Sequence, residues 1–283
     1  MTLAAASIVF GPAGPVLRPG PVLPVEAMLL GKPVAEAAEL LPRLFNLCRV
    51  AQGMAALLSL GLPAAGDLRA EVIRDHLMKL CLLLPRALGV APLPLPADPA
   101  CLPGSRGLPA DGNPAGWDSP LAPLATRIAA AFAPGEACSD ALPPPPRPLA
   151  EGAFENSAAG RQAGHPALKA IEAAHGRGPL WRFFGLVADL DAALQGRLPA
   201  PTVANGIACV PAARGAYGLR IAQAGGIVTG LHRRTPTDHL LAPGGALIGA
   251  LAALPLAKRA LAPLVVALHD PCIPVTIDEV QHA

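Results

Sequence analysis

The sequence predicts a helix-dominated α+β fold, and two observations lead to this prediction. Apolar residues recur at helical spacing over residues 33–60, 67–89, 165–176 and 178–198. Between residues 202 and 243, short apolar segments alternate with glycine-rich turns, a pattern typical of strands. The length of 283 residues suffices to bury a sizeable core in one large domain or two small ones.

In the first third of the chain, prolines and glycines mark the expected element boundaries. Residues 1–25 are broken by both residue types and predict short strands and turns, with strand candidates at 8–10 and 22–25. A helix is expected over 33–41, because Pro42 would break or kink it. After a turn at 44–48, a second helix should run to Leu60. Asp67 is a candidate N-cap for a third helix that continues to about residue 89.

The central stretch, residues 91–150, is rich in proline and reads as an irregular loop, insert or partner-binding arm. It has polyproline character near 143–146, and a short helix is expected at 121–132. Cys101 and Cys138 lie inside it, and such a setting argues against either as a metal ligand. Towards the C-terminus we expect a buried helix over 243–263, a short apolar strand from residue 264, and an irregular end.

Composition argues against several classes of function. The net charge is only +2, with 22 Lys and Arg against 20 Asp and Glu and no dense basic run, which disfavours nucleic-acid binding. The N-terminus does not resemble a signal peptide. The most apolar stretch, 244–268, is interrupted by prolines and by Lys258 and Arg259, so a membrane span is not expected. The expected location is therefore the cytoplasm.

Six cysteines are scattered along the chain, and no pair has CxxC spacing. In a reducing compartment such cysteines are usually small buried apolar residues. We expect Cys81 and Cys209 to pack in the core and His76 to have a packing or surface role. Any cysteine proposed as a ligand therefore needs a further argument.

That argument comes from three short segments: RLFNLCRVAQG at 43–53, ARGAYG at 213–218 and HDPCIPVTID at 269–278. In this order they resemble the large subunit of nickel–iron hydrogenases, which carries R-x-C-G-x-C-x-x-x-H near its N-terminus and D-P-C-x-x-C-x-x-H near its C-terminus. Arg43 and Cys48 match the first motif, Arg214 matches the arginine of the family's middle motif, and Cys272 matches the last. TPTDH at 235–239 resembles a further family stretch.

The departures from that pattern matter most. Phe45 and Val275 stand where the family has its other two metal-binding cysteines, so nickel would lose half of its ligands. No nickel and no hydrogen turnover are expected. The chain instead resembles the HupK/HoxV-type hydrogenase accessory proteins, degenerate relatives of the large subunit. The resemblance, over most of 1–90 and 155–283, implies a reduced large-subunit-like domain spanning 1–283, with 91–150 as a proline-rich loop or insert.

The resemblance implies a maturation factor, not an enzyme. Cys48 and Cys272 would transiently hold iron that carries cyanide and carbonyl ligands, because soft thiolates suit such a centre. Arg214 would donate hydrogen bonds to cyanide nitrogens, and Gln52 and His239, with Asp270, would orient groups around the metal. The implied partners are the hydrogenase large subunit and the maturation proteins that supply the iron fragment.

Alternatives remain open from the sequence. Cys48 could be a core cysteine, Arg214 a surface residue, and His239 and His269 structural histidines. The protein could also be a metal-free large-subunit mimic that acts as a chaperone-binding scaffold, or an enzyme with Cys48 and Cys272 as a redox pair. The sequence does not establish that the two cysteines meet in space.

Overall fold

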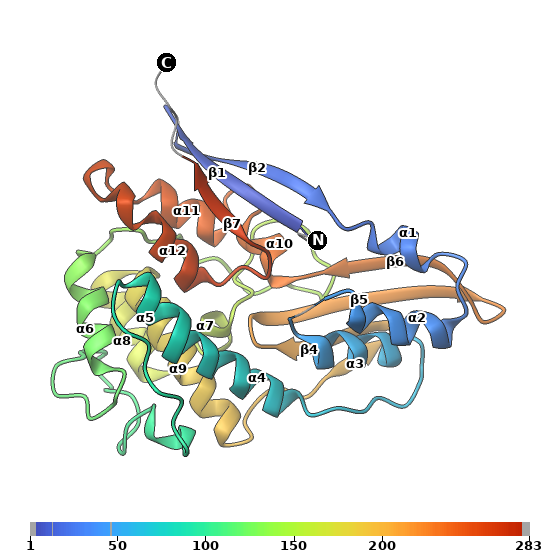
Figure 1. Cartoon of the computed structure of the whole chain (residues 1–283), viewed down its shortest axis with the longest axis horizontal. Helices are drawn as coiled ribbons and strands as arrows, with labels where there is room; N and C mark the ends of the chain where they lie inside the picture. Colours follow the sequence, from blue (N-terminus) through green and yellow to red (C-terminus); the bar gives the residue numbers. More distant parts are fainter. Residues whose placement is uncertain (1–3, 13, 46, 279–283) are drawn as a thin grey trace.

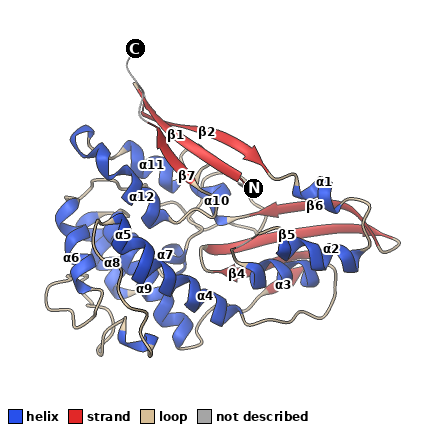
Figure 2. Cartoon of the chain, in the orientation of Figure 1, coloured by secondary structure: helices blue, strands red, loops and turns tan. Residues whose placement is uncertain are grey.

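The computed structural model describes residues 4–12, 14–45 and 47–278. It combines helices with a mixed three-stranded sheet and an antiparallel four-stranded sheet. Most of the helices gather at one end of the molecule, and the longer sheet extends to the other end with the helices of residues 25–59 beside it (Figure 1). Figure 2 shows the same division by type of element. The predicted α+β class is therefore confirmed.

A three-stranded sheet pairs the N-terminal hairpin with the last described strand. Its strands, in spatial order, are β2 (Gly14–Val22), β1 (Ala4–Gly11) and β7 (Val275–Asp278). β1 pairs with β2 in antiparallel fashion and with β7 in parallel fashion. The expected irregular C-terminal end is thus wrong for residues 275–278, since four residues carry too little periodicity to reveal a strand. The expected strand at 22–25 is also wrong beyond its first residue, because Val25 begins helix α1 (Val25–Leu29).

A four-stranded antiparallel sheet follows the chain order, as the glycine turns predicted. Its strands are β3 (Thr202–Ala204), β4 (Ile207–Ala212), β5 (Gly215–Ala224) and β6 (Ile227–Arg234). Gly206, Gly225 and Gly226 have positive φ at the turns, where a side chain would be strained. One face packs against α3 (Arg49–Ser59), near α2 (Val34–Leu40) and the 3-10 turn η1 (Leu41–Arg43). The break expected at Pro42 is confirmed.

The helical end is organised around α9 (Pro179–Leu194), whose residues Trp181, Phe183 and Phe184 are buried completely. The helices α4 (Leu68–Leu77), α6 (Ala122–Ala131), α7 (Ala158–Arg161), α8 (Pro166–His175) and α12 (Ala262–His269) pack around it. The Asp67 side chain accepts a bond of 2.9 Å from the amide of Ala70, which confirms the predicted N-cap. The predicted long helix continues from α4 through a π-helical turn, η2 (Met78–Leu83), into α5 (Leu84–Ala87).

The central segment, residues 91–150, is mostly without regular structure, apart from α6 and the 3-10 turn η3 (Pro99–Cys101). It nevertheless contributes buried side chains to the core around α9. The rings of Trp117 and Phe184 stack with centroids 5.1 Å apart. Gly218 in β5 lies so close to Pro148 that an added Cβ would sit 2.2 Å from its carbonyl oxygen. The segment is thus packed against both the helices and the longer sheet.

The region before the C-terminal strand is more broken than predicted. In place of one helix over 243–263 it contains α11 (Ala246–Ala252) and the 3-10 helix η4 (Leu256–Leu261). Helix α10 (Pro236–Leu240) lies at the end of the stretch 202–243, where only strands were expected, so that prediction is wrong for these residues. The strand expected from residue 264 is wrong, because these residues belong to α12. The residues 264–268 are all apolar and mostly buried, so their sequence shows no periodicity that would distinguish a helix from a strand. Across the described residues, no helix has both the length and the apolar character needed to cross a membrane.

Candidate functional site

Cys48 lies at the junction between a loop and helix α3. It is the N-cap residue of that helix, with φ 54° and ψ 40°, and its side chain is largely buried. Glu71 from α4 accepts hydrogen bonds from the amides of Val50 (2.7 Å) and Ala51 (3.0 Å). A carboxylate at this place satisfies free helix N–H groups and complements the helix dipole. Cys48 is therefore held by a helix start that α4 fixes in place.

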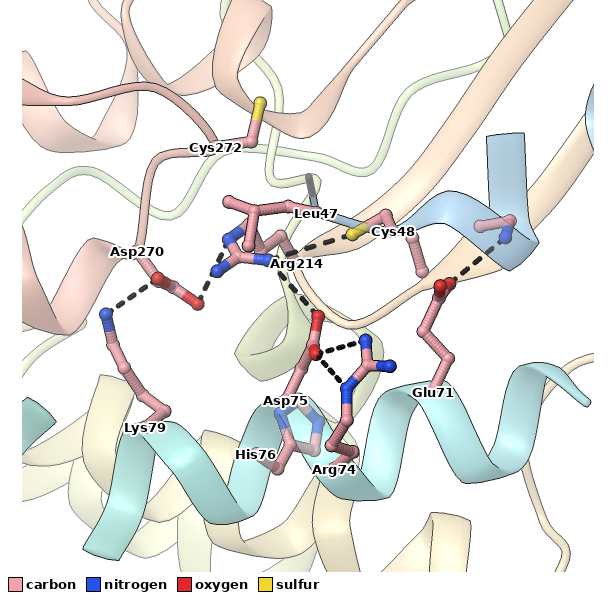
Figure 3. A network of polar contacts seen from close by, with 12 residues as sticks. Leu47, Cys48, Glu71, Arg74, Asp75, His76, Lys79, Arg214, Asp270 and Cys272 are labelled. Atoms are coloured by element: carbon pink, nitrogen blue, oxygen red, sulfur yellow. Dashed lines mark hydrogen bonds and ion pairs between the residues drawn. The ribbon is translucent and has the colours of Figure 1, made fainter. Parts of the chain in front are cut away.

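Arg214, in the turn between β4 and β5, extends towards Cys48 (Figure 3). Its guanidinium donates to the Cys48 sulfur over 3.7 Å. The same group lies 3.5 Å from a carboxylate oxygen of Asp75 and 3.4 Å from one of Asp270. Arg214 thus connects the first and last of the three segments that the sequence singled out.

These contacts form part of a continuous row of alternating charges. Arg74 pairs with Asp75 at 2.8 Å, and Lys79 pairs with Asp270 at 2.6 Å. The row Arg74–Asp75–Arg214–Asp270–Lys79, called the ion-pair chain below, joins α4 to the β4–β5 turn and to the end of α12. Because each interior charge has partners of opposite sign on both sides, the largely buried guanidinium is stabilised.

The turn that carries Arg214 is itself anchored from behind. Arg161 donates to the carbonyl oxygens of Ala212 (3.0 Å) and Gly215 (3.3 Å), which flank the turn. Arg161 also forms two hydrogen bonds with the buried carboxylate of Asp189, at 2.8 and 2.6 Å. The position of Arg214 therefore depends on a second ion pair within the helical core.

Cys272 follows α12 and is only partly buried. Its amide donates to the hydroxyl of Thr237 over 2.7 Å, and that hydroxyl donates to the Cys272 sulfur over 2.9 Å. In Figure 3 the sulfur of Cys272 points away from the Arg214 guanidinium. The two cysteines are not joined by a disulfide; Arg214, which contacts both Cys48 and Asp270, links the segments that carry them.

Burial keeps the Cys48 thiol protonated at neutral pH. Burial raises its pKa to about 12, Arg214 opposes this shift, and Glu71 and Asp75 add to it. Burial alone would lower the pKa of Arg214, but Asp270 and Cys48 outweigh it and raise the value. For Asp270, burial is outweighed by Lys79 and Arg214, so its pKa falls and the carboxylate is charged.

The other predicted residues occupy different surroundings. Gln52 lies one turn into α3, and its amide nitrogen donates to the Leu47 carbonyl oxygen over 3.2 Å. His239, on α10, bonds through Nδ1 to the Gly152 carbonyl oxygen at 2.9 Å. Its ring lies edge-on to Phe154. Within the described residues, neither Gln52 nor His239 forms a hydrogen bond with Cys48 or Cys272.

The remaining cysteines differ in burial, and Cys209, expected in the core, is only partly buried. Cys81 is completely buried, as expected for a packing residue, and Cys101 is exposed. The Cys138 thiol donates to the carbonyl oxygen of His175 over 3.1 Å. Among the residues that the structure describes, no group of three or more His, Cys, Asp or Glu side chains could hold a metal ion. A metal at Cys48 and Cys272 would therefore have to bring other ligands with it.

Sequence reasoning missed Glu71, Asp75 and Lys79, as well as Arg74 and Thr237. The first three are spaced by four along one helix, so they share one face. That spacing was a usable signal for a charged stripe facing a partner. Thr237 lies within the TPTDH stretch that the sequence singled out, but no local pattern marks its contact with Cys272, which joins residues 35 positions apart.

Comparison with known proteins places the chain in a class. The search against protein-family models finds no match. A search of curated proteins finds a hydrogenase expression/formation protein that is 50% identical over 295 residues, an alignment covering 99% of each chain. That relative is HupK of Rhodobacter capsulatus, and the chain therefore belongs to the HupK family of hydrogenase expression/formation proteins. The family predicted from the three segments is confirmed.

Proposed function

We propose that this protein is a non-catalytic maturation factor that carries the iron–cyanide–carbonyl fragment of a nickel–iron hydrogenase. Cys48 and Cys272 would hold the fragment in a reduced version of the large-subunit fold. The protein would work in the cytoplasm and receive its cargo from the maturation proteins that build it. It would then deliver the fragment to the hydrogenase large subunit.

One set of contacts supports this function most directly. Arg214 contacts Cys48 across 166 positions of sequence and also contacts Asp270, two residues before Cys272. The three segments that resemble metal-binding motifs of the large subunit are therefore neighbours in the folded chain (Figure 3).

The chemistry of the site suits a fragment that supplies most of its own ligands. Thiolates are preferred ligands for a soft iron centre, and two of them suffice when diatomics fill other positions. The Arg214 guanidinium, which contacts Cys48 through Nη1 and faces Asp270 through Nε at 3.4 Å, would donate to a cyanide nitrogen beside Cys48. Gln52 Oε1 is unpaired within the described residues, one helical turn from Cys48. Gln52 and His239 would orient groups around the cargo.

Release of the cargo follows from the same surroundings. Cys48 must lose its proton to bind a metal, and its raised pKa favours recovery of that proton. A site with only two protein ligands, one of them a thiol with a raised pKa, should release its cargo more readily than a site with four thiolates. Such exchange is what a carrier requires.

Infrared spectroscopy on protein purified without oxygen, from cells that are making hydrogenase, tests this function. Cyanide and carbonyl stretches are expected in the wild type and should be absent from Cys48→Ala and Cys272→Ala. Cys101→Ala, which changes an exposed cysteine, should keep the bands. A wild type without such bands would reject the carrier function and favour a metal-free large-subunit mimic or chaperone-binding scaffold.

A further inference from the structure

The hydroxyl of Thr237 binds both the backbone and the side chain of Cys272. It accepts from the Cys272 amide at 2.7 Å and donates to the sulfur at 2.9 Å. A threonine hydroxyl has one proton and two lone pairs, so it can make both bonds at once. One oxygen atom therefore restrains the chain at Cys272 and the rotation of its side chain.

Thr237 is suited to this task because its own position is fixed. Its side chain is buried on α10, which begins with a capping box between Thr235 and Asp238. His239 ties the same helix to the Gly152 carbonyl oxygen. The hydroxyl thus lies on an anchored element, whereas Cys272 lies in the connection between α12 and β7.

The ion-pair chain does not perform this role for Cys272. Arg214 donates to the sulfur of Cys48, while the Cys272 sulfur points away from that guanidinium (Figure 3). Each thiol thus has its own polar partner: Arg214 for Cys48 and Thr237 for Cys272.

We propose that Thr237 is the positioning residue of Cys272, an assignment that rests on the proposed function. The hydroxyl selects the direction of the sulfur and donates to it, which leaves the other sulfur lone pairs for a soft metal. Groups that orient metal ligands in this way typically change metal affinity by about 10- to 100-fold when removed. His239 would act one step further away, by holding the helix that carries Thr237.

Cadmium binding to the reduced, metal-free full chain tests the assignment. Cadmium is a soft divalent ion whose thiolate complexes absorb in the ultraviolet, and the signal lost in Cys272→Ala identifies the share that depends on Cys272. Thr237→Val keeps the shape but lacks the hydroxyl, so it should weaken that binding by about 10- to 100-fold. Thr237→Ser should remain within a few-fold of wild type. Thr229→Val makes the same change at an exposed position on β6 and should have no effect.

Melting curves show whether each variant is folded, and Thr237→Ala replaces the valine variant if that one does not fold. A folded variant without the hydroxyl that binds cadmium like wild type would overturn the assignment. So would a wild type whose cadmium binding does not depend on Cys272. Loss of affinity in Thr237→Val, with no infrared bands in the wild type, would keep the positioning role and reject the iron cargo.

Discussion

The buried carboxylate of Asp189 is the point at which the helical core and the thiol site are coupled. It lies in α9 with no exposed surface, and it accepts hydrogen bonds from Arg161, from Gln162 (2.8 Å) and from His76 (2.8 Å). Arg161 in turn holds the turn that carries Arg214. We predict that Asp189→Asn, which removes the charge and keeps the shape, destabilises the fold.

The size of the effect follows from burial. Removing one partner of a buried ion pair costs about 3–5 kcal/mol, because the other charge is left uncompensated. The Arg161 side chain is 11% exposed, so water can reach it and the lower end, about 3 kcal/mol, is expected. For a chain of 283 residues that corresponds to a melting temperature lower by roughly 5 °C.

Thermal unfolding followed by far-ultraviolet circular dichroism measures this shift. Asp191→Asn is the matched control, since Asp191 lies two residues further along α9 and pairs near the surface with Arg197 at 2.8 Å. It should cost less than about 1 kcal/mol. If Asp189→Asn melts within about 2 °C of wild type, then the carboxylate does not stabilise the core as argued.

The same pair determines a response to acid. Burial alone would raise the pKa of Asp189, but Arg161 outweighs it and holds the value below its ordinary range. The unfolded chain therefore takes up this proton first as the pH falls below about 4, and the stabilisation is lost from there downwards. Wild type should lose stability in that range more steeply than Asp189→Asn, and equal slopes would contradict the assignment.

Three further predictions concern other parts of the molecule. Burial above all lowers the pKa of His269 to about 3, so wild type should lose about 1.4 kcal/mol per pH unit as the pH falls below about 6.5. Urea titrations should show that His269→Gln removes this slope. Gly218→Ala would place a Cβ 2.2 Å from the Pro148 carbonyl oxygen and should cost about 1–3 kcal/mol in urea unfolding, whereas Gly230→Ala, with a 3.7 Å contact, should change little. The Cys48 thiol has a pKa of about 12, so it must release its proton when it binds a metal. Loss of this one proton should make cadmium affinity rise about tenfold per pH unit between about pH 6 and 8. A pH slope that Cys48→Ala leaves unchanged would show that Cys48 does not bind the metal.

Local signals predicted much of the framework correctly. The N-cap at Asp67, the break at Pro42 and the glycine turns of the longer sheet depend on neighbouring residues only. The order of three degenerate motifs was enough to predict the family, which the HupK relative confirms. The errors fall where local signals are ambiguous. Residues 264–268 are all apolar, so their pattern does not distinguish a helix from a strand. Residues 275–278 form strand β7 only because they pair with β1.

The sequence by itself determined the candidates: two cysteines, one arginine and the segments that carry them. Only the tertiary structure decided their surroundings. It placed Arg214 between Cys48 and Asp270, and it supplied Thr237 to Cys272. The physical reason is distance along the chain. Helix caps and turns arise from bonds within a few residues, whereas these contacts join residues 35 to 166 positions apart and form only when the core packs.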